Sequence, residues 1–315
     1  FWDGESLLFL EYNQKFGKKL SLRFGPGLSY VQYRLHGDER KDKFSPRLHF
    51  NLIYRSSKNQ QIRLGCPIGN GYLRIDQLNE VEQQIDSLQI RRGNPHQKIA
   101  FQTTPMITYS GQFGRFNIGA NLLYNVINNA TVEYFYMEND RLIRTFRSEG
   151  KHRSFTSQLS GAWKVTDNLR IKLAGNWVYV KYKSTPEELK YFSGSAQIDY
   201  YWSDFSCGVF AKSRTKWLNL NLMRGAEPFQ YGGYVSWTHH NWHIEGGFRN
   251  LFVRHSKKES VMDRGVYRYE NVAISKLDQQ TGYIKVAYTF DFGKKISRDN
   301  SNIDKVINSA ILKTN

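Results

Sequence analysis

Segments of ten or more residues in which apolar and polar side chains alternate run through most of the chain. In residues 168–179, for example, Leu169 and Ile171 alternate with Arg170 and Lys172. Successive side chains of a β-strand point to opposite faces of its sheet, so this period of two predicts strands with one apolar and one polar face. About thirteen such runs occur. They span residues 6–15, 20–35, 46–56, 60–66, 99–110, 115–127, 152–165, 168–183, 189–203, 205–218, 229–238, 241–253 and 281–292.

The connections between these runs alternate between short and long. The short ones are Phe16–Lys19, Ser56–Asn59, Gly111–Gly114, Thr166–Asp167, Ser203–Asp204 and His239–His240. The long ones are residues 36–45, 67–98, 127–151, 219–228 and 254–280, and Ser184–Glu188, in a long-connection position, is of intermediate length. Outer-membrane barrels have this asymmetry, because their periplasmic turns are tight and their extracellular loops are long. A soluble sandwich has no reason to sort its loops in this way. We therefore predict an all-β fold, a transmembrane antiparallel up-and-down β-barrel.

Composition agrees with this fold class and excludes others. Hydrophobic residues make up 40% of the 315 residues and charged residues 23%, so the chain is not disordered. No apolar run approaches the roughly 18 residues that a transmembrane helix needs. The net charge of +17 makes an anionic membrane surface or a nucleic acid a reasonable partner. Nucleic-acid binding is the weaker of these two predictions, because it needs charged and stacking aromatic residues on one face and here they occupy opposite strand faces.

Four of the seven tryptophans lie next to the short connections: Trp163, Trp202, Trp237 and Trp242. At a membrane interface an indole buries its ring in lipid and keeps its N–H near water. The positions thus predict an aromatic girdle at the short-turn rim. The alternative is a soluble barrel with these rings in its core.

The long connection between residues 71 and 98 carries a recognisable motif. It contains Gln77-Leu78-Asn79 and, further on, Gly93-Asn94-Pro95 followed by Lys98. This text resembles the long extracellular loop of TonB-dependent receptors of the Bacteroidota outer-membrane barrel type. The match is partial, because Gln97 replaces the leucine of the family and Ile99-Ala100 replace Pro-Glu. The text around residues 288–295 and 308–313 resembles the end of such barrels.

The resemblance implies a barrel of about 22 strands, of which residues 1–292 would form the C-terminal part. A signal peptide, a plug domain, an energy-coupling segment and about nine strands would then lie upstream. Residues 293–315 would form a periplasmic tail, in which Ile303, Val306, Ile307, Ala310 and Ile311 have the spacing of a short amphipathic helix. The chain would thus be a fragment of a multi-pass protein of the cell outer membrane.

The function implied by the resemblance is import of a large or scarce nutrient, such as an iron chelate, a vitamin or a glycan. Its partners would be outer-membrane lipid and lipopolysaccharide, the energy-coupling complex of the inner membrane acting through the missing plug, and a surface lipoprotein. Two alternatives stay open: a non-transporting barrel that serves adhesion or assembly, and a passive porin. No cofactor is expected.

Enzymatic activity has no support in the sequence. The nucleophile-elbow, zinc-helix, phosphate-loop and dinucleotide motifs are all missing, and an all-strand chain lacks the strand-turn-helix context that they need. The cluster His239, His240 and His243 predicts a solvated turn rather than a metal site, because a two-residue turn rarely brings three imidazoles together. The acidic stretch Asp76, Glu80, Glu82 and Asp86 most simply forms a solvated loop face.

Charged side chains on the polar strand faces are the best candidates for ligand contacts in the lumen. They are Arg170, Lys172, His243, Glu245, Arg249 and Lys285. The cations would attract anionic ligands, or would pair with carboxylates such as Glu245 and Asp291. Other basic residues fall in or beside the loops, close to where lipopolysaccharide phosphates would lie: Arg144, Arg147, Lys151, Arg153, Arg254, Lys257 and Lys258.

Overall fold

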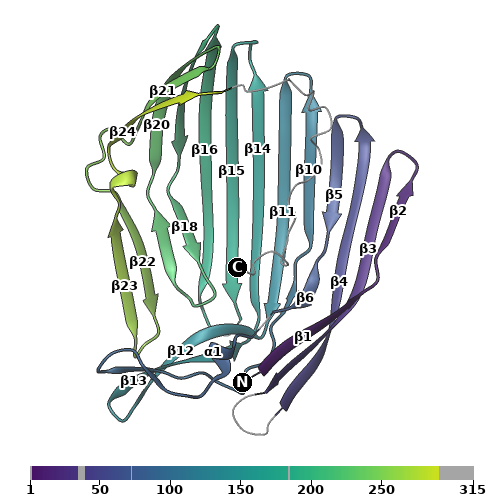
Figure 1. The fold of residues 1–315 in the computed structure, drawn as a ribbon, viewed down its shortest axis with the longest axis vertical. Helices are drawn as coiled ribbons and strands as arrows, with labels where there is room; N and C mark the ends of the chain where they lie inside the picture. Colours follow the sequence, from purple (N-terminus) through teal and green to yellow (C-terminus); the bar gives the residue numbers. More distant parts are fainter. Residues whose placement is uncertain (1, 35–39, 72, 184, 291–315) are drawn as a thin grey trace.

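The computed structural model describes residues 2–34, 40–71, 73–183 and 185–290. Thirteen antiparallel strands follow one another through one large sheet, here called the wall (Figure 1). In spatial order these are β1 (Trp2–Phe9), β3 (Leu20–Arg34), β4 (Arg40–Ser57), β5 (Gln60–Gly65), β10 (Met106–Phe113), β11 (Phe116–Asn128), β14 (His152–Lys164), β15 (Leu169–Tyr182), β16 (Glu188–Trp202), β17 (Phe205–Lys212), β20 (Gln230–His239), β21 (Trp242–Arg249) and β24 (Thr281–Tyr288). The predicted all-β fold and strand number are confirmed.

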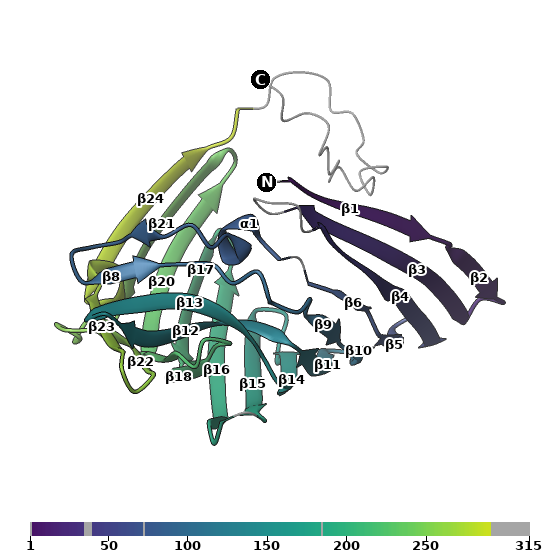
Figure 2. The same ribbon diagram turned by 90° about the horizontal axis from the view of Figure 1, so that it is seen from below.

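The wall curves into an open trough with a concave inner face and a convex outer face (Figure 2). β1 and β24 are its edges, and among the described residues each pairs with a wall strand on one side only. Three shorter strands extend the wall strands, namely β2 (Tyr12–Phe16) beside β3, and β6 (Ile68–Asn70) and β9 (Phe101–Thr103), which pair with each other.

The structure corrects several predicted strand boundaries. The run 99–110 is interrupted at Pro105, which has no N–H to donate, so β9 and β10 are separate strands. The run 205–218 leaves the wall after Lys212, and its last residues join another sheet. The run 241–253 ends at Arg249, because Asn250 takes a positive φ of 51° and turns the chain.

The short connections all lie at one end of the wall, at the top of Figure 1, and the long connections at the other. We call these ends the short-turn rim and the long-loop rim. Gly17 and Gly114 occupy the short turns with φ of 62° and 57°, a conformation that costs glycine little and other residues more. The short and the long connections thus lie at opposite ends of the wall, as their alternation in the sequence predicts.

The outer face carries two aromatic belts with an aliphatic band between them. Cross-strand pairing aligns Phe116 with Trp163 and Phe205 with both Trp202 and Trp237 near the short-turn rim. The other belt contains Tyr124, Phe155, Trp177, Tyr179 and Phe192. On β15 the belts are eight residues apart, about 27 Å along the strand. This height matches the apolar band of roughly 25 Å on outer-membrane barrels.

Two smaller sheets cover the long-loop rim, where the sequence analysis expected irregular loops. One consists of β12 (Ala130–Glu138), β13 (Arg141–Glu149), β8 (Gln89–Arg91) and β7 (Gln83–Gln84). The other consists of β18 (Thr215–Leu218), β19 (Arg224–Glu227), β22 (Lys257–Asp263) and β23 (Arg268–Ile274). Residues 71–98, which the sequence analysis placed wholly in a connection between strands, therefore contain the short strands β7 and β8. In the view of Figure 2, β12 and β13 cross the mouth of the trough.

Contacts between loops hold these sheets together. The Phe135 and Tyr267 rings stack with their centroids 4.2 Å apart. The guanidinium of Arg264 donates to the carbonyl oxygen of Glu133 at 2.7 Å, and the N–H of Glu133 donates to Asn221 Oδ1 at 3.0 Å. The long loops are therefore one folded assembly.

The only helical segments among the described residues are α1 (Ile75–Leu78) and the 3₁₀ turn η1 (Lys276–Asp278). Within the described part of the chain, no helix is long and apolar enough to cross a membrane. The predicted tail at residues 293–315, with its amphipathic helix, lies outside the described residues, as does the end of the last predicted strand.

Placing the same charge on neighbouring but opposite faces of β15 tests the assignment of the outer face to lipid. Leu173 is 58% exposed on the outer face, and Ala174 is the next residue, on the inner face. We expect Leu173→Lys to reduce the free energy of unfolding in lipid by about 2–4 kcal/mol, because it places an ammonium group in hydrocarbon. Ala174→Lys should cost far less. Urea unfolding in bilayers measures both, and equal costs would contradict the assignment.

Candidate functional site

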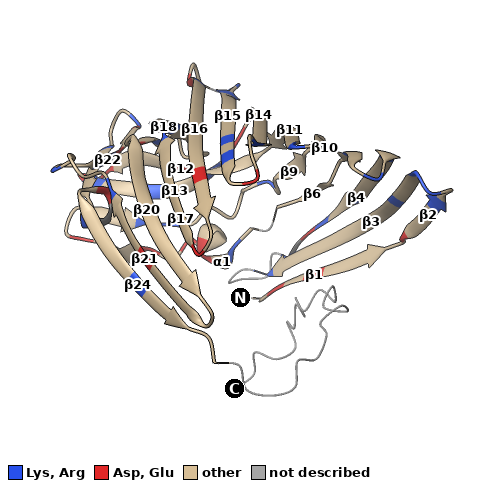
Figure 3. Ribbon diagram, turned by 90° about the horizontal axis from the view of Figure 1, so that it is seen from above, with Lys and Arg blue, Asp and Glu red and all other residues tan. Residues whose placement is uncertain are grey.

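All six predicted lumen residues lie on the inner face, in two separate groups. Arg170 and Lys172 stand on β15, and the other four on β21 and β24. The register places Arg170 opposite Asp199, and Glu245 opposite Lys285. Figure 3 marks the basic and acidic positions along the wall strands. Strands β16, β17 and β20 separate the two groups, so the six side chains do not form one site.

Asp199 organises the first group. Its carboxylate is 1% exposed and accepts from Lys172 Nζ at 3.0 Å, from Gln197 Nε2 at 2.8 Å and from the Tyr234 hydroxyl at 3.0 Å. A buried carboxylate requires this number of donors to offset its lost hydration. Lys172 is therefore ion-paired within the wall. This is one of the two alternatives that the sequence analysis left open, the other being contact with an anionic ligand.

The second group contains one organised carboxylate and two cations without an ion pair. Glu245 accepts from the Tyr283 hydroxyl at 2.9 Å and lies 3.6 Å from His243 Nε2. Among the described residues, neither Arg249 nor Lys285 lies within ion-pair distance of a carboxylate. These two side chains thus keep their positive charge available on the inner face, and their contact with a ligand stays a prediction.

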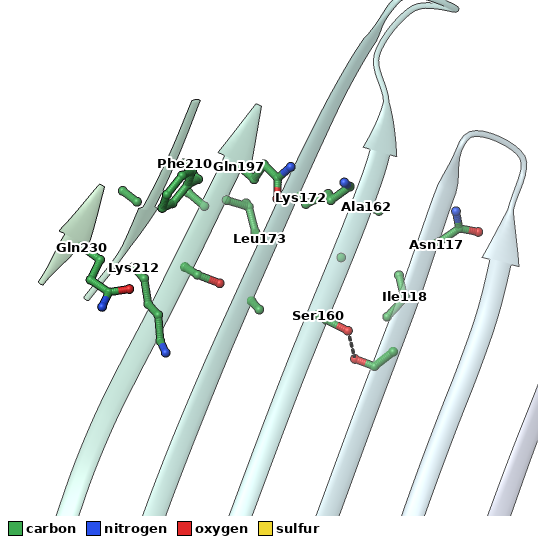
Figure 4. Close-up of a pocket in the computed structure, with 16 residues that line it drawn as sticks. Asn117, Ile118, Ser160, Ala162, Lys172, Leu173, Gln197, Phe210, Lys212 and Gln230 are labelled. Carbon is green, nitrogen blue, oxygen red and sulfur yellow. Dashed lines mark hydrogen bonds between the residues drawn. The ribbon is translucent and has the colours of Figure 1, made fainter. Parts of the chain in front are cut away.

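The inner face carries a basin of about 550 Å³ at the middle of the wall. Asn117, Lys172, Gln197, Lys212 and Gln230 line it with polar groups, and Phe210 adds one aromatic ring (Figure 4). Because Asp199 already neutralises Lys172, the ammonium group of Lys212 and the three amides are the groups that can bind an anionic or strongly hydrogen-bonding ligand. The sequence analysis did not identify Lys212 and Gln230. Both lie at strand ends on the polar face, and that position could have indicated them.

The predicted loop motif residues come together, and their role in this structure is to fold the loop. The N–H groups of Gly93 and Asn94 donate to the carbonyl oxygens of Asn79 and Gln77 at 2.7 and 2.8 Å. The side chain of Asn94 donates to the carbonyl oxygen of Phe146 at 2.8 Å, and Lys98 N donates to Ser148 Oγ at 2.6 Å. We call these four hydrogen bonds the loop clamp. Pro95 directly follows Asn94.

Leu78 anchors the same loop to the wall. It is buried in a cluster with Val31 and Tyr33 of β3, together with Leu73 and Ile99. The loop motif therefore fixes α1 against the inner face of β3 and ties the following segment to β13.

A polar pocket of about 730 Å³ opens beside this clamp. Tyr134, Tyr136 and Arg147 of the β12–β13 hairpin line it, facing Glu82 and Arg92. The Arg147 guanidinium lies 3.1 Å from the centroid of the Tyr134 ring. The hydrogen bond with the Tyr136 hydroxyl raises the pKa of Arg92, which keeps that guanidinium charged. Arg92 is ion-paired with Glu82 and Glu138, so this pocket offers tyrosine rings and hydrogen-bonding groups to a planar polar ligand rather than free positive charge.

The described residues contain no group of three potential metal ligands. His239 Nδ1 donates to Asp204 Oδ2 at 2.6 Å, and His243 Nδ1 forms a 2.8 Å hydrogen bond with the Thr238 hydroxyl, so these two imidazoles have separate partners. In the acidic stretch, Asp76 pairs with Arg91 at 2.6 Å and Glu82 with Arg92 at 3.2 Å.

No protein-family model matches the chain, and no curated protein matches it in sequence. Its fold, however, is similar to that of solved transport proteins. The copper transporter OprC superposes with a TM-score of 0.70 at 11% identity, over 91% of this chain and 48% of that one. The FrpB iron transporter from Neisseria meningitidis, F5-1 variant, gives 0.67 at 10% identity, over 91% and 46%. The ferric enterobactin receptor PfeA from Pseudomonas aeruginosa gives 0.57 at 16% identity, over 80% and 40%.

This chain therefore spans less than half the length of these solved structures. All three are named as transporters or receptors and none as an enzyme.

Removal of Asp199 tests the first inner-face group. Asp199→Ala leaves the donors of Lys172, Gln197 and Tyr234 without their acceptor, so we expect a loss of about 3 kcal/mol in the free energy of unfolding. Asp204→Ala is the matched control, because Asp204 pairs with His239 at the exposed rim and should cost less than about 1 kcal/mol. Urea unfolding in detergent or lipid measures both, and similar costs would refute the network.

A methyl group at Gly93 tests the loop clamp. Its Cβ would lie 2.3 Å from the carbonyl oxygen of Asn79, so Gly93→Ala must separate the two loop segments. We expect about 1–3 kcal/mol of local destabilisation and faster proteolysis within residues 71–98. Gly69→Ala is the control, because its Cβ would have no neighbour closer than 3.9 Å. Unchanged proteolysis of the Gly93 variant would contradict the clamp.

Proposed function

Because the chain has the barrel fold of TonB-dependent receptors, we propose that it is the C-terminal part of such a receptor in an outer membrane. The protein imports a large or scarce nutrient such as an iron chelate, a vitamin or a glycan. The partial Gln-Leu-Asn and Gly-Asn-Pro match supports the Bacteroidota type. The observation that carries the proposal is a wall whose outer face is aromatic and aliphatic and whose inner face holds ordered polar groups.

The open edges support a larger assembly. Backbone N–H and C=O groups exposed to hydrocarbon cost several kcal/mol each, so β1 and β24 need strand partners in a bilayer. Further strands of the same protein, or a second chain, would provide them. In the proposed receptor a plug domain fills the lumen, contacts the inner face and couples release of the ligand to the inner-membrane energy complex. A surface lipoprotein is a further proposed partner above the loops.

The charge distribution favours an anionic nutrient. Arg249, Lys285 and Lys212 lie on the inner face without ion pairs among the described residues, and Lys212 lines the basin. An anionic ligand that enters from the long-loop rim would thus reach inner-face cations that have no carboxylate partner among the described residues. An anionic iron chelate fits this path better than a neutral glycan.

Uptake assays test the proposal and separate it from its alternatives. Deletion of the gene should abolish growth on one limiting nutrient, and collapse of the proton gradient should stop uptake of that nutrient into cells that carry the gene. Uptake that survives the collapse would indicate a passive porin. A deletion strain with unchanged growth on every nutrient and reduced attachment would indicate an adhesion scaffold.

A double substitution tests the role of the unpaired cations. We expect Arg249→Gln with Lys285→Gln to reduce uptake of an anionic chelate about tenfold, because two inner-face charges are lost. Uptake of a neutral substrate of similar size should change little. Lys18→Gln with Lys58→Gln removes the same charge from the short-turn rim and is the control. Equal uptake by both double variants would contradict the predicted ligand contact.

A further inference from the structure

The β12–β13 hairpin, here called the arm, is joined to the wall by two short links. Asn129 connects it to β11, and Gly150 and Lys151 connect it to β14. Asn129 has a positive φ of 53°, which turns the chain as it leaves β11. Because the arm crosses the mouth of the trough (Figure 2), a movement at these links would change access to the inner face.

The residue that follows the second link, His152, is buried and is 8% exposed. Its ring contacts that of Tyr182, its partner in the register of β14 and β15, with the two centroids 4.9 Å apart. Among the described residues, His152 Nδ1 has no hydrogen-bond partner, and no carboxylate lies within ion-pair distance of the imidazole. The imidazole is therefore packed as a neutral ring, without a counter-charge.

Tyr182 connects His152 to the rest of the loop assembly. Its ring is part of a buried apolar cluster that includes β18. Its hydroxyl donates to the carbonyl oxygen of Asn219, in the turn between β18 and β19. In the same turn, Asn221 Oδ1 accepts from the N–H of Glu133 in the arm at 3.0 Å. A path of contacts thus runs from the second link back to the arm, and we call His152, Tyr182 and Asn219 the latch.

The charged groups around the latch oppose a further positive charge. Arg264, in the turn between β22 and β23, lies close enough to Tyr182 to interact with it electrostatically. The carboxylates of Glu133 in β12 and Glu149 in β13 face this guanidinium. Lys151, beside the imidazole in the chain, is a second cation and is exposed. A proton on the imidazole would therefore add charge to a buried region that already holds a guanidinium, and burial of an unpaired charge is costly.

Burial also determines how the latch responds to pH. His152 lies three residues beyond Phe155 of the aromatic belt, toward the long-loop rim, and so outside the membrane-spanning part of β14. Burial lowers the pKa of its imidazole below the ordinary value of about 6.5. An imidazole with a lower pKa in the closed latch than in water takes up a proton when the latch opens. The closed latch is therefore fully stable above about pH 6.5 and loses stability as the pH falls below that value.

We propose that the latch is an acid-sensitive switch that controls the arm. A neutral His152 packs against Tyr182 and holds the base of the arm next to the turn between β18 and β19. A protonated His152 moves from its buried site into water, Tyr182 separates from Asn219, and the arm moves away from the mouth of the trough. Every group involved belongs to this chain, so the inference goes beyond the proposed function and does not depend on which nutrient is imported.

Hydrogen exchange in the full-length protein, placed in lipid nanodiscs, tests the proposal. The exchange rates of the arm amides are measured from about pH 7.5 to about pH 5 and corrected for the intrinsic pH dependence of exchange. Opening takes up one proton, so we expect the corrected rates to rise by up to about tenfold per pH unit below about pH 6.5. The amides of β15 in the same sample should stay protected. An equal loss of protection in β15 would show general unfolding in acid and would overturn the proposal.

Two substitutions of His152 separate a switch from a purely structural role. His152→Phe keeps a buried ring that cannot bind a proton, so the protection of the arm should no longer depend on pH. His152→Lys introduces a cation and should give rapid exchange of the arm amides even at neutral pH. His255→Gln removes an exposed loop histidine and should leave the pH dependence unchanged. The proposal fails if the arm of the His152→Phe variant opens in acid as it does in the unaltered protein.

Discussion

The hydrogen bonding of the backbone across the wall is the constraint on which the rest of this structure depends. In hydrocarbon no water is present to satisfy peptide groups, so every wall strand must pair along both of its edges. That requirement explains the long strands, such as the 15 residues of β3 and β16, and the tight turns at one rim. It also explains why the long connections all lie beyond one end of the wall strands, at the long-loop rim.

With the backbone fixed in this way, the inner face can hold polar groups. At two places it does so by packing a tyrosine ring over a glycine of the neighbouring strand. The Tyr234 ring occupies the space beside Gly208, where a Cβ would lie 2.6 Å from the ring, and its hydroxyl reaches Asp199. Tyr283 lies over Gly247 in the same manner and reaches Glu245. In both places the missing side chain of a glycine lets the ring of the neighbouring strand reach a carboxylate, which lies one strand further on for Tyr234 and on the glycine's own strand for Tyr283.

The strands could be predicted from the sequence because lipid on one face and polar groups on the other impose a period of two along every strand. The β12–β13 hairpin was missed, although Asn139 and Asp140 both take positive φ, 49° and 60°, as the residues of a tight hairpin turn do. The Asn-Asp pair between two alternating runs was its signal. The β18–β19 and β22–β23 hairpins gave weaker signals, because only seven residues or fewer form each strand.

The inner-face chemistry could be predicted only in part, because alternation assigns a face and says nothing about the neighbour. Lys172 and Lys285 look alike in sequence, each a lysine between apolar residues. Register then separates them: Lys172 lies within 3.0 Å of the buried Asp199, whereas Lys285 faces a glutamate already bonded to Tyr283. A cation that already has a carboxylate partner contributes to the stability of the wall. A cation without such a partner is available to a ligand. Cross-strand pairing, more than the presence of a charge, therefore decides which cations of this barrel can act on another molecule.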